Sequence, residues 1–130
     1  MIVIDASAMV EALIGRDVDG GLLEAMSAEV AAPHLLDVEV LSVLRGLVLG
    51  GKLQSDVAEA ARADHFELAV DRYDTASVAE RLWDLRHRYT SYEAAYLALA
   101  ETLDVPLHTC DTKLDSGGHD VTVRVHARTH

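Results

Sequence analysis

Apolar residues occur along this chain in short continuous runs that alternate with longer segments of helical periodicity. The run Ile2–Ile4 ends at Asp5, and the residues from Ala6 to Ile14 follow as a helical segment. Similar short runs occur at Val30–Pro33 and at Pro106–Cys110. A continuous apolar run of this length is typical of a strand buried on both faces, as in a parallel sheet.

Taken in order, the pattern alternates strands with one or two helices. It predicts strands at 2–4, 30–33, 67–70, 106–110 and 121–125, and helices at 6–14, 22–29, 35–49, 55–66, 75–88 and 91–103. This order indicates an α/β protein, a three-layer α/β/α sandwich with a central, mainly parallel sheet of about five strands. No repeat or linker divides the chain, so we expect a single domain over residues 1–130.

The composition is that of a globular protein. Half of the residues are hydrophobic and only two are proline, which excludes disorder. A single cysteine, Cys110, excludes an internal disulfide and suits a reducing compartment. No leader-like stretch or run of about 20 apolar residues occurs. We therefore expect a cytoplasmic protein without a membrane segment.

Charge narrows the choice of partners. With 11 Lys and Arg against 22 Asp and Glu, the formal net charge is −11. This balance is wrong for a protein that holds nucleic acid by phosphate contacts alone. It suits a basic protein partner, or a site where bound cations offset local acidic groups.

Two carboxylates follow predicted strands directly. Asp5 comes after the first strand, and Asp111 comes after the strand at 106–110. In open parallel sheets, ligands bind beyond the carboxyl ends of the strands, so these two acids could meet at a topological switch point. The structural alternatives are an N-cap role for Asp5 or Ser7 and a turn role for Asp111, with Lys113 as a neighbour.

The helix at 35–49 offers two further acids, Asp37 and Glu39. At about 100° per residue, one face is apolar, and Glu39 lies about 60° from its centre while Asp37 lies about 100° away. An acid on the shoulder of a buried face needs a partner, so Glu39 is the better site candidate. The alternative is a surface glutamate at the edge of the stripe.

Glu93 lies in the first turn of the helix at 91–103. With Thr90 as N-cap it completes a capping box, which explains Glu93 without any chemistry. A carboxylate in the first turn can also point off the end of its helix. Glu101 lies on nearly the same side but about 12 Å away, too far to share an ion.

Four of these acids are the site candidates: Asp5, Glu39, Glu93 and Asp111. Without histidine or cysteine partners, they suit a hard cation, Mg²⁺ or Mn²⁺. Such a site could activate water for phosphodiester cleavage. The seven histidines show no metal-ligand spacing, so we expect no zinc site. We expect His119, His126 and His130 at the surface.

Four segments in order resemble the PIN-domain family, and most closely its VapC-type ribonuclease toxins. They are VIDAS at 3–7, EVLSVL at 39–44, YEAAYLALAE at 92–101 and PLHTCDTKL at 106–114. The resemblance spans the whole chain. It implies a Mg²⁺- or Mn²⁺-dependent endoribonuclease that cleaves RNA, a homodimer, and a cognate VapB-type antitoxin that blocks the site.

Carried over residue by residue, the resemblance makes Asp5, Glu39, Glu93 and Asp111 a metal-binding, catalytic acidic quartet. Ser7 and Thr109 become hydroxyls that support the acids or contact the substrate. The chain departs from the family at Glu93, where aspartate is usual, and this puts the geometry and metal preference in doubt.

The resemblance also accounts for the acidic charge, because antitoxins of this type often carry arginine in their toxin-binding tails. RNA would then be held by metal ions and local basic residues. The candidates are Arg86, Arg88 and Lys113. Ordinary helix C-terminal cations that stabilise the helix dipole are the alternative for the arginines.

Two rival functions remain open at this point. One is a catalytically weak or inactive PIN-like module that binds a protein partner, which the unusual Glu93 keeps in play. The other is a phosphotransfer enzyme or receiver domain. A phosphatase of that type would want an acid at position 7, where this chain has Ser7, and a receiver would usually pair acids after its first strand.

Overall fold

Five parallel strands form one sheet in the order β3-β2-β1-β4-β5. The computed structural model describes residues 1–130. The strands are β1 (Ile2–Ile4), β2 (Val30–Pro33), β3 (Val70–Tyr73), β4 (Leu107–Thr109) and β5 (Val123–Val125). In the centre, Val3 is aligned with Ala31 of β2 and with Leu107 of β4. The predicted α/β fold with a five-stranded parallel sheet is therefore confirmed.

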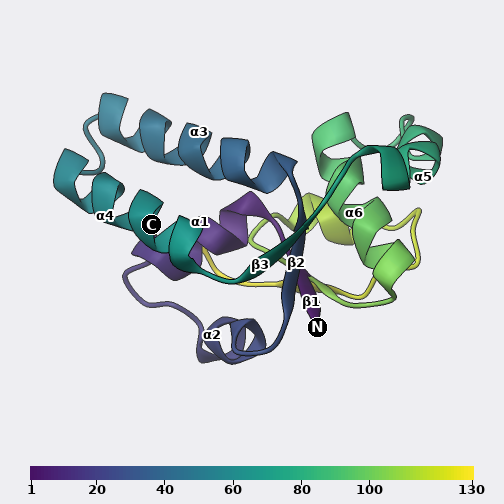
Figure 1. Cartoon of the computed structure of the whole chain (residues 1–130), viewed down its shortest axis with the longest axis horizontal. Coiled ribbons are helices and arrows are strands. Elements are labelled where there is room, and N and C mark those ends of the chain that lie inside the picture. The colour runs from purple at the N-terminus through teal and green to yellow at the C-terminus, as the bar shows by residue number, and fades with distance from the viewer.

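Six α-helices flank this sheet. They are α1 (Ala6–Ile14), α2 (Gly20–Met26), α3 (Leu35–Leu49), α4 (Ser55–Glu67), α5 (Ala79–Asp84) and α6 (Ser91–Leu103). Figure 1 shows α3 and α4 on one side of the strands and α5 and α6 on the other. No helix is both long and apolar enough to cross a membrane.

The core is built around β1 and α6. All three residues of β1 are buried, and so is every residue of α6 from Ala94 to Ala100. Four of those seven helical residues are alanines, which let the helix backbone approach the sheet closely. Full burial of Leu97 and Leu99 contributes about 1.5–3 kcal/mol each. This packing fixes both β1 and the first turn of α6, which carry two of the predicted site acids.

The strand order places a topological switch point between β1 and β4. From β1 the chain moves outward to β2 and β3, and it then crosses back to add β4 and β5 on the other side of β1. Ligand sites of open parallel sheets lie at such a point, beyond the carboxyl ends of the strands. Asp5 follows β1 here and Asp111 lies just beyond β4.

The third strand lies three residues later than predicted. Residues 67–70 were expected to be extended, but α4 continues to Glu67 and β3 begins at Val70. Because β3 is an edge strand with only β2 as its neighbour, it can hold polar residues that the apolar-run criterion passed over. One of them, Arg72, donates to Asp37 of α3 at 2.7 and 3.0 Å, and Asp37 also binds His65 of α4.

Two helices also differ from their predicted ranges. The second begins at Gly20 and ends at Met26, because Asp19 caps it by accepting from the amide of Gly21. The predicted helix at 75–88 is broken into a 3₁₀ turn at Ala76–Val78 and the short α5. The chain leaves the helix so that the Tyr89 hydroxyl can donate to the carbonyl of Gly117 at 2.6 Å.

Two of the histidines expected at the surface are buried. His126 is only 8% exposed, and the side chain of His130 is 6% exposed. His126 donates from Nδ1 to Asp19, because a carboxylate only accepts, and its Nε2 lies 2.8 Å from Nδ1 of buried His108. Burial, with the nearby His126, lowers the pKa of His108 to about 4. Spacing along the chain gave no sign of these contacts.

Candidate active site

The four predicted acids line one cavity of about 230 Å³ at the switch point. Asp5 comes from the end of β1, Glu39 from α3, Glu93 from the first turn of α6, and Asp111 from the turn after β4. Residues separated by up to about a hundred positions in the sequence thus face one space. This convergence is the central geometric fact of the molecule.

Asp5 is the most constrained of the four. It is 6% exposed, and its Oδ1 accepts from the Ser7 hydroxyl at 2.7 Å and from the amide of Ala8 at 3.0 Å. Its Oδ2 accepts from the Thr109 hydroxyl at 2.5 Å. Asp5 is therefore an N-cap of α1, as the structural alternative held, and it also faces the cavity.

Ser7 and Thr109 tie the ends of β1 and β4 together. The Ser7 hydroxyl accepts from the amide of Cys110 at 2.8 Å, and the Thr109 hydroxyl accepts from the amide of Asp111 at 2.9 Å. Each hydroxyl donates to Asp5 and accepts from an amide at the end of β4, so both act as donor and as acceptor. The two residues predicted to support the acids lie where they can do so.

Electrostatics at the cavity follow from burial and from the proximity of like charges. Burial raises the pKa of Asp5, opposed by its three hydrogen bonds and reinforced by the charge of Asp111. Burial also raises the pKa of Glu39, and the charge of Asp5 adds to the effect. The cavity therefore favours a positively charged ligand that would relieve this repulsion.

Glu39, and not Asp37, faces the cavity. Glu39 Oε1 accepts from the buried Tyr96 hydroxyl of α6 at 2.6 Å. Asp37 points elsewhere, to Arg72 and His65, as the helical geometry indicated. Burial and the bond to Glu39 raise the pKa of Tyr96, so the hydroxyl keeps its proton and orients this carboxylate.

Glu93 is both a cap and a cavity residue. Its Oε1 accepts from the amide of Thr90, and its own amide donates to the Thr90 hydroxyl, which completes the capping box. The same Oε1 accepts from the Lys113 ammonium at 2.9 Å. Desolvation would raise the pKa of Glu93, but these bonds outweigh it and the pKa is lowered. Its other oxygen, Oε2, makes no such bond.

The candidate RNA-binding residues are less well placed. Lys113 lies at the cavity through Glu93, but Arg86 and Arg88 do not line it. Arg86 lies over the ring of Trp83 at 4.7 Å, and Arg88 donates to the carbonyl of Ser116 at 2.8 Å. Arg86 also donates to the carbonyl of Trp83 near the end of α5, as the alternative of a helix C-terminal cation expects, whereas Arg88 contacts a turn far along the chain.

Sequence reasoning missed two residues that line the cavity, Arg128 and His130. Their segment returns to α1, where His130 Nδ1 lies 2.9 Å from Oε1 of the fully buried Glu11. In Figure 1 the yellow end of the chain runs back to the side of α1. Glu11 was the available signal, because an acid in the middle of an apolar helix needs a partner.

The donor set fits a hard divalent cation. All four acids offer oxygen, and no histidine or cysteine cluster competes for a softer metal. No three His, Cys, Asp or Glu side chains are gathered into a ready-made three-ligand site. Mg²⁺ usually keeps several waters and uses only one or two carboxylates directly, so this arrangement is compatible with it.

The fold and the acid-lined cavity define the class of this protein. Residues 2–119 match the PIN domain, and the chain belongs to the PIN-domain family. Curated relatives are VapC ribonucleases. Ribonuclease VapC1 of Mycobacterium tuberculosis is 42% identical over 115 residues, covering 86% of each chain. Ribonuclease VapC9 of the same organism is 39% identical over 119 residues, covering 91% of each.

Solved structures share the fold at lower sequence identity. PAE2754 from Pyrobaculum aerophilum is 19% identical with a TM-score of 0.73, covering 94% of this chain and 81% of that one. A toxin–antitoxin complex from Klebsiella pneumoniae includes a chain that is 18% identical with a TM-score of 0.57, covering 91% and 92%.

A substitution at Asp111 tests the repulsion in this cavity. Because the pKa of Asp5 is raised on folding, its charge destabilises the fold above its folded pKa and costs nothing below the unfolded value of about 3.9. In EDTA at pH 7, Asp111→Asn should raise the free energy of unfolding by less than about 1.4 kcal/mol, the equivalent of one pKa unit. The turn should persist, because asparagine can still accept from the amide of Lys113. Urea unfolding at pH 7 and pH 3.5 measures the gain, which should vanish at the lower pH.

Asp115→Asn is the matched control, because Asp115 is an exposed acid in the same turn that does not line the cavity. If both variants gain equally, the effect reflects net charge and the argument for local repulsion is wrong.

Proposed function

We propose that this protein is a Mg²⁺- or Mn²⁺-dependent endoribonuclease that acts as the toxin of a toxin–antitoxin pair. The single observation that carries the proposal is the convergence of Asp5, Glu39, Glu93 and Asp111 on one cavity at the switch point. Membership of the PIN-domain family and identities of 39–42% to VapC ribonucleases support the choice of RNA as substrate.

The acids would hold the cation, and the chain's own hydrogen bonds would orient them. When bound, Mg²⁺ or Mn²⁺ supplies a polarised water and neutralises charge on the phosphate oxygens. Ser7 and Thr109 fix both oxygens of Asp5, so its orientation costs little reorganisation during the reaction. Tyr96 donates to Glu39 Oε1 and orients this carboxylate, whose Oε2 accepts no hydrogen bond and would be available to the cation.

Cleavage of RNA should require both the metal and Asp5. With Mg²⁺ or Mn²⁺ the purified protein should cut a structured RNA, and excess EDTA or Asp5→Ala should lower the rate by at least about 10²-fold, the scale of losing a positioned catalytic group. Gel assays of labelled RNA give the measurement. Asp37→Ala, an acid on the same helix as Glu39 but outside the cavity, is the control for nonspecific effects.

Cleavage that persists in EDTA would contradict the metal-dependent mechanism. A protein that binds its partner but cleaves nothing with added Mn²⁺ would instead favour the inactive PIN-like module. The departure from aspartate at Glu93 is the feature that favours that second candidate.

Variants at Glu93 separate its two roles. Glu93→Gln keeps the capacity to accept from the amide of Thr90, so the fold should persist while cleavage falls. Glu93→Asp, the residue usual in the family, should retain or raise activity. Thermal melts and cleavage rates measured on the same preparations distinguish these outcomes. Full activity in Glu93→Gln would show that Glu93 is a cap only.

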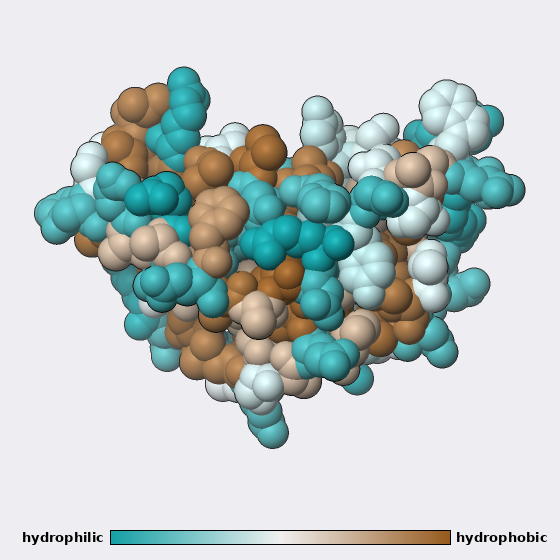
Figure 2. All heavy atoms as spheres, viewed as in Figure 1, coloured by the Kyte–Doolittle hydropathy of each residue, from teal (hydrophilic) through white to brown (hydrophobic).

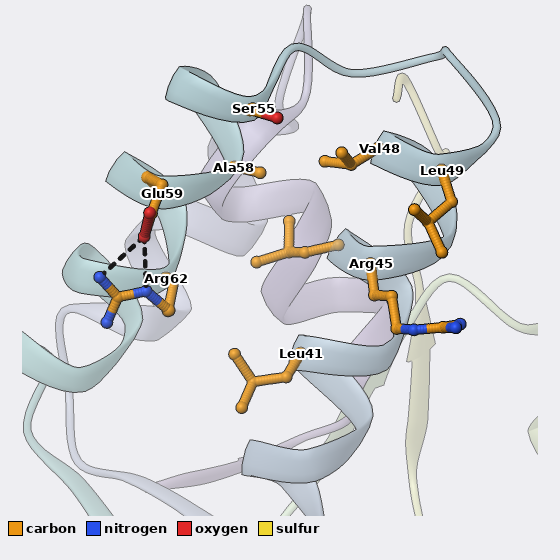
Figure 3. A pocket seen from close by; sticks show the side chains of 9 residues that line it. Leu41, Arg45, Val48, Leu49, Ser55, Ala58, Glu59 and Arg62 are labelled. Atoms are coloured by element: carbon orange, nitrogen blue, oxygen red, sulfur yellow. Dashed lines mark hydrogen bonds and ion pairs between the residues drawn. The ribbon is translucent and has the colours of Figure 1, made fainter.

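The antitoxin would bind the groove between α3 and α4. The groove has a volume of about 310 Å³ and is lined by Leu41, Leu44, Arg45, Val48 and Leu49 of α3 and by Ser55, Ala58, Glu59 and Arg62 of α4. Figure 3 shows Leu41 and Val48 directed toward α4, with the Glu59–Arg62 ion pair on the opposite wall. Figure 2 shows hydrophobic side chains exposed over α3, where Val38 is 67% and Leu49 69% exposed.

A charged substitution in this groove should disrupt the complex with the antitoxin and leave nuclease activity unchanged. Leu41→Asp places a carboxylate on the apolar wall, so co-expression with the protein encoded by the neighbouring reading frame should no longer yield a stable complex. Leu23→Asp, at an exposed leucine of α2, is the matched control. Co-purification and cleavage are both measured. Unchanged co-purification of Leu41→Asp would remove α3–α4 as the binding surface.

A further inference from the structure

A second, larger groove adjoins the acidic cavity. Its volume is about 700 Å³, and it runs between the end of α1, the second half of α3 and the C-terminal segment. Three residues line both spaces: Val43, Arg128 and His130. The groove and the acidic cavity are therefore neighbours.

The groove is basic although the protein is acidic. Arg16, Lys52 and Arg128 line it, all three are exposed, and no Asp or Glu side chain does so. None of the three forms an ion pair, whereas Arg62, Arg72, Arg81 and Lys113 each pair with an acid. Seven of the 11 lysines and arginines therefore have no acidic partner, and three of these seven are gathered beside the candidate active site.

A buried latch, defined here as Glu11 with Thr129 and His130, holds this wall in place. Glu11 is fully buried and accepts from the amide of Thr129 at 2.7 Å, from the Thr129 hydroxyl and from His130. The amide of Arg16 donates to the carbonyl of Thr129 at 3.4 Å. The latch therefore fastens together the two chain segments that carry Arg16 and Arg128.

Gly15 makes room for the latch. A Cβ atom at this position would overlap both the carboxylate and the carbonyl oxygen of Glu11. Glutamate is seldom fully buried without a partner. The arrangement is consequently a built structure and not an accident of an exposed tail.

We propose that this groove is the track for the RNA backbone next to the cleaved phosphate, with Arg16, Lys52 and Arg128 contacting phosphates and Glu11 as a positioning residue. The inference rests on the proposed ribonuclease function and adds the surface that holds the substrate. It resolves the mismatch between a net charge of −11 and an RNA ligand, since the cations are concentrated where the strand would enter.

Binding of a labelled single-stranded oligoribonucleotide in EDTA tests the track without cleavage. For single strands the slope of log K against log salt is about −0.7 per phosphate contact, which corresponds to about fourfold in affinity per contact at 0.15 M salt. Each of Arg16→Ala, Lys52→Ala and Arg128→Ala should weaken binding by about that factor, and the triple variant by about fiftyfold. The triple variant should also flatten the salt slope by about 2.

Arg124→Ala is the matched control, because Arg124 is an exposed, unpaired arginine on β5 outside the groove. If wild type does not bind, or if the triple variant binds as tightly as Arg124→Ala, the track is wrong. Either result leaves metal-dependent cleavage by the wild type standing. Failure of the proposed track is therefore distinguishable from failure of the proposed ribonuclease function. Equal displacement of the RNA by an oligo-aspartate peptide would reassign the groove to an acidic protein and overturn the proposal.

Glu11→Gln gives a test in which two explanations differ in sign. The change removes a negative charge, so net charge alone predicts tighter RNA binding, whereas loss of the latch predicts binding weakened about as much as in Arg128→Ala. Circular dichroism confirms folding. If Glu11→Gln does not fold, Thr129→Val replaces it, because this change removes the hydroxyl that donates to Glu11 and accepts from the amide of Asp17. Tighter or unchanged binding in the folded variant would refute the positioning role.

Discussion

The structure depends on the way two strand ends are held together around Asp5. A buried carboxylate is costly unless its oxygens are satisfied, and Asp5 is satisfied only because hydroxyls from Ser7 and Thr109 reach it from the two sides of the switch point. The same hydroxyls accept amides from the β4 end, so the arrangement orders the backbone as well as the acid. The position of Asp5 follows from this junction, while Tyr96 orients Glu39 and the capping box holds Glu93.

The junction also sets a balance between stability and function. Burial raises the pKa values of Asp5 and Glu39, and repulsion from a neighbouring carboxylate adds a smaller contribution, so keeping these acids charged has a cost. The buried core of β1 and α6 offsets it, because these elements fix the acids regardless of their mutual repulsion. The acid-lined cavity is thus kept in place partly by core residues, such as Leu97 and Leu99, that do not line it.

Much of the fold and the acid set could be predicted from the sequence, because both depend on patterns among residues that are close together in the chain. Apolar runs that end in an acid located β1 and β4 with Asp5 and Asp111, and helical periodicity separated Glu39 from Asp37. The edge strand β3 and the break after Asp84 depend on contacts between distant residues, such as Arg72 with Asp37 and Tyr89 with Gly117. Residue spacing carries no information on such contacts, and for the same reason it missed Arg128 and His130.

The order in which the cavity residues occur along the chain has a consequence for synthesis. The central strand, β1, is made before its neighbour β4 and before the segment that carries Arg128. A chain emerging from the ribosome holds Asp5, Glu39 and Glu93 well before Thr109 and Arg128 exist to complete their surroundings. Because contacts between distant residues form late and domains fold as units, the incomplete chain cannot assemble the site. Translation itself therefore delays the appearance of the assembled cavity until the segment that carries Arg128 has been made.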